Sequence, residues 1–148
     1  MKNFYKFNFN LDETFDEYKL IKDFLDPNLV GQFYDDFSVF SSEILSSINS
    51  SKTSLEKIGI WVNHYSQGDF NEIHNHDHEE YQQKCDYTGI LILEVGENED
   101  LIILDETNTI PSSYKLTDGD CYLIRNDIFH GLEVVNDKLI ALMFMVKS

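Results

Sequence analysis

The chain has 148 residues, of which 42% are hydrophobic and 14% aromatic, and its formal net charge at pH 7 is -16. This composition is typical of a packed globular domain and excludes an extended disordered chain. The acidic excess argues against a nucleic-acid groove, which needs clustered Lys and Arg. Because there is no apolar run of 18 residues and no signal-peptide pattern at the start, we expect a cytoplasmic protein that does not span a membrane.

The N-terminal part predicts one strand followed by two helices. Residues 5–11, with the sequence YKFNFNL, alternate apolar and polar side chains as a half-buried strand does. Residues 12–25 contain a capping box and predict a short helix. Residues 27–48 follow an Asp-Pro start and repeat apolar residues every three or four positions, which predicts a longer amphipathic helix. The strand needs a partner surface, and a second copy of the chain in a homodimer could supply it.

The rest of the chain predicts strands. Short runs rich in Ile, Leu, Val and Tyr alternate with turn clusters such as GENED and TDGD. Many short strands behind a helical segment indicate a mainly β fold, a sandwich or barrel with helices packed on the outside. No internal repeat or low-complexity linker divides the chain. We therefore expect one domain, with the strand and helices in residues 1–56 and the barrel in residues 57–148.

The stretch GDFNEIHNHDHEEY, residues 68–81, contains a His-x-His pair that favours a metal site. His74 and His76 are separated by one residue, and such positions on a strand point to the same side, so both imidazoles can bind one ion. A third ligand must come from elsewhere, and the candidates are His64, Asp77, His78, Glu80 and His130. A distant strand that brings a third histidine beside the pair leaves open positions for water, oxygen or substrate. The alternative is a solvated acidic loop rich in histidine.

The same residues carry a resemblance to the cupin superfamily. Its first motif is Gly, five residues, His-x-His, three or four residues, Glu, and then Gly after six more. This sequence matches the motif at Gly68, His74, His76, Glu80 and Gly89. The one departure is the last gap, which is eight residues long instead of six.

The second cupin motif is Gly, five residues, Pro-x-Gly, two residues, His. Gly119 and His130 keep this spacing, with Arg125 and Asp127 in place of Pro and Gly. A narrower likeness, over residues 58–146, is to phage and marine-bacterial proteins described as 2-oxoglutarate and Fe(II) dependent oxygenases, which share a double-stranded β-helix with cupins. Its strongest piece is WVNHYSQGDF, which leads into the His-x-His pair.

The resemblance implies a double-stranded β-helix, the cupin or jelly-roll barrel, with an iron site. It implies that His74, His76 and His130 bind Fe(II) and that Glu80 is a candidate fourth ligand, with Zn, Ni and Mn as alternative ions. Such oxygenases commonly have Asp or Glu where this chain has His76. They also hold the far carboxylate of 2-oxoglutarate with a basic residue on the strand after the distal histidine. Lys138 is available for that role, so 2-oxoglutarate is a candidate co-substrate.

Three further residues are candidate contacts for a bound small molecule. Arg125 lies five residues before His130, near the mouth of the predicted site. Its guanidinium can bind an acidic ligand with two hydrogen bonds, and the alternative is a surface ion pair. Asn63 and Tyr65 share one face of their predicted strand.

Two functions remain open from the sequence. One is an Fe(II)-dependent dioxygenase that acts on a small molecule, with catalytic residues unassigned. The other is a non-catalytic metal-binding cupin that binds or senses a small ligand. A metal site closed by Glu80 would favour the second function, whereas an open face of three histidines would favour O₂ chemistry.

Overall fold

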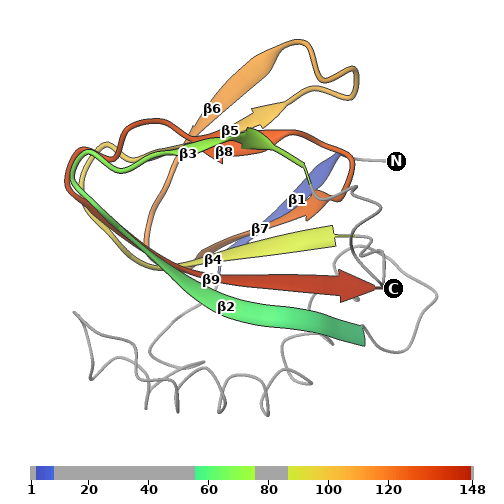
Figure 1. The fold of residues 1–148 in the computed structure, drawn as a ribbon, viewed down its shortest axis with the longest axis horizontal. Helices are drawn as coiled ribbons and strands as arrows, with labels where there is room; N and C mark the ends of the chain where they lie inside the picture. Colours follow the sequence, from blue (N-terminus) through green and yellow to red (C-terminus); the bar gives the residue numbers. More distant parts are fainter. Residues whose placement is uncertain (1–2, 9–55, 76–86, 148) are drawn as a thin grey trace.

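The computed structural model describes residues 3–8, 56–75 and 87–147. These residues form two antiparallel sheets that lie face to face as two layers (Figure 1). The larger sheet has the strand order β1 (Phe4–Asn8), β7 (Asp120–Arg125), β4 (Tyr87–Val95), β9 (Lys138–Lys147) and β2 (Glu56–Ser66). The smaller sheet has the order β3 (Asn71–His74), β8 (His130–Leu132), β5 (Asp100–Leu104) and β6 (Pro111–Lys115).

The central strands of the larger sheet, β4, β7 and β9, are buried on both faces. Toward the smaller sheet they present Ile90, Ile92, Tyr122, Ile124 and Met143, which form one core cluster with residues such as Leu101 and Ile103 of β5. On their other face, Leu91, Leu123 and Phe144 are each fully buried. Burial on both faces explains why the central strands are continuous apolar runs instead of alternating ones.

A close contact fixes the packing on that second face. A Cβ atom added to Gly89 would lie 2.0 Å from the ring of Phe144, and these two residues are Cα partners between β4 and β9. Glycine therefore leaves room for the tip of the Phe144 ring, which accounts for the glycine within the run YTGILILEV.

The structure confirms a mainly β barrel of antiparallel strands over residues 57–146 within the described ranges. The helices predicted in residues 12–25 and 27–48 lie outside the described residues. Residues 5–8 of the strand predicted at 5–11 are present in β1, which pairs with β7 of the same chain, and residues 9–11 lie outside the described residues. A partner surface for one edge of that strand is thus supplied within the chain, and the homodimer stays a prediction. Among the residues described, no helix has the length and hydropathy to cross a membrane.

Candidate metal centre

Two of the predicted ligands meet where the smaller sheet ends. His74 is the last residue of β3 and His130 is the first residue of β8, and they are Cα partners in this antiparallel pair. Directly opposed residues of neighbouring strands place their side chains on the same face. The two ring centroids are 4.7 Å apart, with an angle of 53° between the ring planes. Two imidazoles bound at about 2.1 Å to adjacent positions of one ion have centroids roughly 4.5 Å apart.

Backbone carbonyl groups orient both imidazoles. The Nδ1 atom of His74 lies 2.7 Å from the carbonyl oxygen of Glu72, and Nδ1 of His130 lies 3.1 Å from that of Ile128. A carbonyl oxygen can only accept, so we assign the hydrogen to Nδ1 in each ring. A neutral imidazole that donates through Nδ1 presents the lone pair of Nε2, which is the form that binds a metal ion.

The two rings differ in burial. His130 is only 2% exposed, whereas His74 is half-buried. His130 also borders a small cavity between the sheets, of about 10 Å³, whose other polar lining residues are Tyr65 and Asn71. A volume of this size holds about one water molecule. The candidate centre thus has one histidine inside the barrel and one near its edge, with apolar walls behind them.

The hydroxyl group of Tyr65 is the centre of a small polar cluster at this cavity. Nδ2 of Asn63 donates to it at 3.1 Å, and Nδ2 of Asn71 lies 3.5 Å away. Burial raises the pKa of Tyr65, against the opposing effect of these two hydrogen bonds. The phenol therefore stays protonated at neutral pH and can act as a hydrogen-bond donor. Asn63 and Tyr65 do share one face of β2, as the sequence predicted.

The structure does not bring Lys138 to the cavity. Leu139, Ala141 and Met143 of β9 line the cavity, so Lys138, in the alternate register, points to the other side of the sheet. Its Nζ atom lies 2.7 Å from Oε1 of Glu94. The side chain of Lys138 is thus engaged by a carboxylate away from His130.

The side chain of Arg125 is also paired with a carboxylate. Its Nε and Nη2 atoms donate to the two carboxylate oxygens of Asp127, at 2.5 Å and 3.1 Å. This hydrogen bond raises the pKa of Arg125. The partner, Asp127, occupies the position of the glycine in the Pro-x-Gly of the second cupin motif. The ion pair considered as the alternative role of Arg125 is therefore present, and contact with a ligand stays a prediction.

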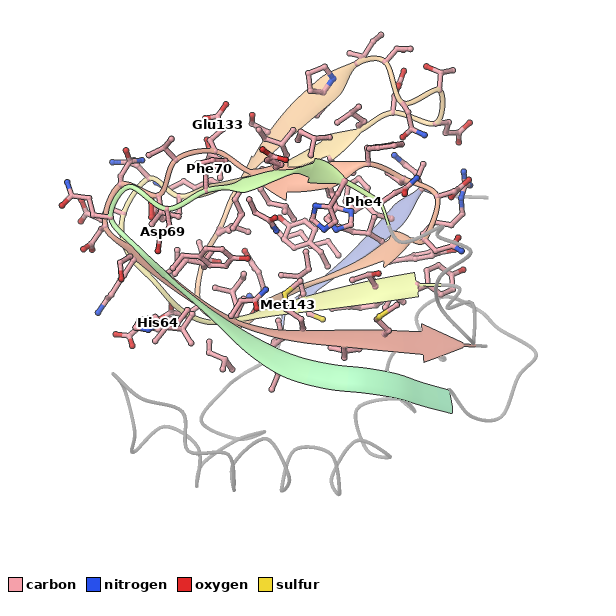
Figure 2. All side chains as sticks on the ribbon, in the orientation of Figure 1. Phe4, His64, Asp69, Phe70, Glu133 and Met143 are labelled. Atoms are coloured by element: carbon pink, nitrogen blue, oxygen red, sulfur yellow. The ribbon has the colours of Figure 1, made fainter. Side chains whose placement is uncertain are left out.

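Of the remaining candidate ligands, one is described by the structure and four are not. His64 is exposed and lies toward the end of the sheets where β2 turns into β3, while Met143 lies between the two layers (Figure 2). His76, Asp77, His78 and Glu80 lie outside the described residues. In the described ranges alone, no three metal-binding side chains gather at one point. His74 and His130 are accordingly the part of the predicted ligand set that the structure brings together.

Sequence reasoning missed the residues that support the two histidines. Asn71 lies at the cavity beside Tyr65, and the carbonyl groups of Glu72 and Ile128 hold the rings. Carbonyl groups leave no signal in a sequence. For Asn71 the available signal was its place at the start of the strand that ends in His74.

The fold is one that solved oxygenases share. No protein-family model matches the sequence, and no curated protein is similar to it in sequence. Solved structures do match the fold. An oxidoreductase of the 2OG-Fe(II) oxygenase family from Burkholderia pseudomallei has a TM-score of 0.66 at 9% identity, and the match covers 82% of this chain and 57% of that one. This chain thus spans little more than half of that protein.

Two other matches extend over nearly all of the chain. The viral collagen prolyl hydroxylase of Paramecium Bursaria Chlorella virus-1, in its 2OG complex, has a TM-score of 0.65 at 12% identity, covering 99% of this chain and 96% of that one. HygX from Streptomyces hygroscopicus with iron bound has a TM-score of 0.64 at 10% identity, covering 98% and 82%. At such identities the likeness establishes the fold. The predicted jelly-roll fold is confirmed at that level.

Proposed function

We propose that this protein is an Fe(II)-dependent oxygenase that acts on a small molecule. His74, His76 and His130 hold the iron in this proposal, and Glu80 is a further candidate ligand. The observation that carries it is the pairing of His74 with His130, with ring centroids 4.7 Å apart and both Nδ1 atoms at carbonyl oxygens. His76 completes the set in this proposal because it is two residues from His74, a spacing that would put both side chains on one side if the extended chain continues past the end of β3.

The choice of metal follows from the donor atoms and the related structures. Imidazole nitrogens suit Fe(II), Zn, Ni and Cu, and Mn is also compatible with a mixed nitrogen and oxygen site if Glu80 takes part. HygX has been solved with iron and with nickel plus 2-oxoglutarate, which supports Fe(II) here. Bound Fe(II) would supply the activation of O₂. The chain itself contributes oriented Nε2 atoms and a mostly apolar interior around a cavity with room for about one water molecule.

2-Oxoglutarate is the proposed co-substrate, held by neutral hydrogen-bond donors. The viral prolyl hydroxylase was solved as a 2OG complex, which supports a keto acid at the equivalent site. Tyr65 is protonated at neutral pH, and Asn71 lies beside it. Both can donate to a carboxylate bound beside His130, and the cavity between them, which has room for about one water molecule, must widen to admit it. Lys138 and Arg125 each already pair with a carboxylate of the chain, so they are less available than these donors.

Anaerobic reconstitution with Fe(II) tests the proposal. We expect one equivalent of Fe(II) to bind, and added 2-oxoglutarate to produce a new visible absorption band as its keto acid group binds the metal. The His130→Ala variant should show neither effect, because it loses the buried ligand. His64→Ala is the matched control, since His64 is exposed, and it should behave as wild type.

Two results would overturn the proposal. Fe(II) binding that persists in His130→Ala would show that His130 is not part of the metal site. An absorption spectrum unchanged by 2-oxoglutarate would show that 2-oxoglutarate does not bind the metal. No observation on the described residues favours the alternative of a non-catalytic metal-binding cupin. A cytoplasmic location and a homodimer are further proposals, which cell fractionation and sedimentation would test.

A further inference from the structure

The hairpin loop between β5 and β6 places one side chain against the segment that precedes His130. Asn108 has a φ of 56°, a left-handed conformation that Asn adopts more readily than most residues. Its Nδ2 atom donates to the carbonyl oxygen of Asp127 at 3.1 Å. Its Oδ1 atom accepts from the backbone N–H of Phe129 at 3.0 Å. One side chain thus holds the backbone on both sides of Ile128.

The residue held in this way orients the buried histidine. Ile128 is fully buried, and its carbonyl oxygen lies 3.1 Å from Nδ1 of His130. The backbone N–H of Leu104, at the end of β5, adds a third hydrogen bond, to the carbonyl oxygen of Phe129 at 3.0 Å. The position of the Ile128 carbonyl group therefore depends on contacts from the hairpin, and the plane of the His130 ring depends on that carbonyl group.

The loop that carries Asn108 is itself fixed by local hydrogen bonds. The carboxylate of Asp105 accepts from the backbone N–H groups of Thr109 at 2.9 Å and Ile110 at 3.1 Å, and from the hydroxyl group of Thr107 at 3.0 Å. The N–H of Asn108 donates to the carbonyl oxygen of Asp105 at 2.9 Å. A loop organised in this way can present the amide of Asn108 in one orientation, whether or not a metal ion is bound.

We propose that Asn108 is a positioning residue for the metal centre, which it serves by fixing the Ile128 carbonyl group that orients His130. This inference rests on the proposed function, because it concerns a ligand of that centre. Partners of metal-binding histidines typically change metal affinity by about 10- to 100-fold when they are removed. Asn108 acts one residue further out, so about a tenfold loss of affinity is expected.

Co²⁺ binding is the test, because its visible spectrum reports both the affinity and the coordination geometry. Asn108→Gly keeps the left-handed backbone and removes both side-chain hydrogen bonds. Asn108→Asp keeps an acceptor for Phe129 N–H and loses the donor to Asp127. The matched control is Asn98→Gly, at the other left-handed Asn of the described residues. The carbonyl oxygen of Asn98, which accepts from Asn136 Nδ2 at 2.8 Å, is retained there.

We expect the dissociation constant for Co²⁺ to rise about tenfold in Asn108→Gly and less in Asn108→Asp, with a shifted visible band. Asn98→Gly should bind as wild type, although both glycine variants raise the entropy of the unfolded chain alike. Wild-type affinity and spectrum in both Asn108 variants would overturn the inference. An equal loss in Asn98→Gly would also overturn it, because the effect would then be one of general stability. Unchanged Co²⁺ binding in His130→Ala would instead refute the proposed function.

Discussion

The two sheets of the barrel differ in how their residues are used. In the central strands of the larger sheet both faces are buried, and side chains such as Phe144 and Leu91 are fully enclosed. In the smaller sheet the strands are short, and one face carries exposed residues such as Ile73. His74 and His130 lie at the ends of these short strands. Stability should therefore depend mainly on the larger sheet and metal binding on the smaller one, and the two should be separable by mutation.

The largest effect on stability is expected in the larger sheet. Phe144→Ala removes a ring that is fully buried and lies over Gly89, so the free energy of unfolding should fall by about 3–5 kcal/mol. Denaturant unfolding of the metal-free protein measures this loss. Val134→Ala, at a side chain that is 58% exposed, should change it by less than about 0.5 kcal/mol. Equal losses of unfolding free energy in the two variants would contradict the view that stability depends mainly on the buried side chains of the larger sheet.

A smaller loss of stability, with no loss of metal binding, is expected at Glu99. This buried carboxylate accepts from the backbone N–H groups of Asn136 at 2.8 Å and Asp137 at 3.3 Å. Glu99→Ala should cost about 1–3 kcal/mol because buried donors lose their acceptor. The dissociation constant for Co²⁺ should stay at the wild-type value. A metal affinity that falls together with stability would indicate that the two properties are coupled.

The affinity for 2-oxoglutarate should depend on the face of the larger sheet that lines the cavity and not on its opposite face. Tyr65→Phe removes one hydrogen bond at the cavity and should weaken 2-oxoglutarate binding to the Fe(II) protein by about threefold to tenfold. Lys138→Ala should leave that binding unchanged, because Lys138 points away from the cavity and pairs with Glu94. Titration of the visible absorption band measures both constants. A larger loss of affinity in Lys138→Ala than in Tyr65→Phe would indicate that Lys138, and not Tyr65, holds the carboxylate of 2-oxoglutarate.

The smallest effect concerns the hairpin loop at Asp105. Hydrogen bonds from the backbone N–H groups of Thr109 and Ile110 lower the pKa of Asp105 below its ordinary value of 3.8. Because the pKa is lower in the folded state, the charged carboxylate stabilises the fold fully at pH values above the unfolded-state pKa. This contribution is lost as the pH falls below 3.8 and through the folded-state pKa. An NMR titration of this carboxyl group should have its midpoint below 3.8. A midpoint at or above that value would contradict the hydrogen-bonded loop.

Much of the barrel could be predicted because its strands leave a local signal. Runs such as YTGILILEV are apolar, short and bounded by turn residues, and the spacing between Gly119 and His130 matches a known motif. The pairing of His74 with His130 follows from that motif, although the two residues are distant in the chain. The sequence thus located the strands and the two histidines that the structure brings together.

The direction of the side chains could not be predicted in the same way. Alternation shows that Lys138 and Leu139 point to opposite sides, but in a strand buried on both faces it does not show which side is the interior. The placement of Lys138 beside Glu94 needed the structure. The contact of Asn108 with Asp127 and Phe129 joins two loops about twenty residues apart, and no periodic pattern records such a contact.

The central claim is that the His-x-His pair and the distant histidine form one metal site. Metal analysis of dialysed protein after loading with Fe(II) under anaerobic conditions tests it most directly, in wild type and in the His74→Ala, His76→Ala and His130→Ala variants. We expect about one equivalent in wild type and a loss of stoichiometric binding in each variant, because two ligands rarely retain an ion that three hold well. Equal metal content in wild type and all three variants would contradict the account.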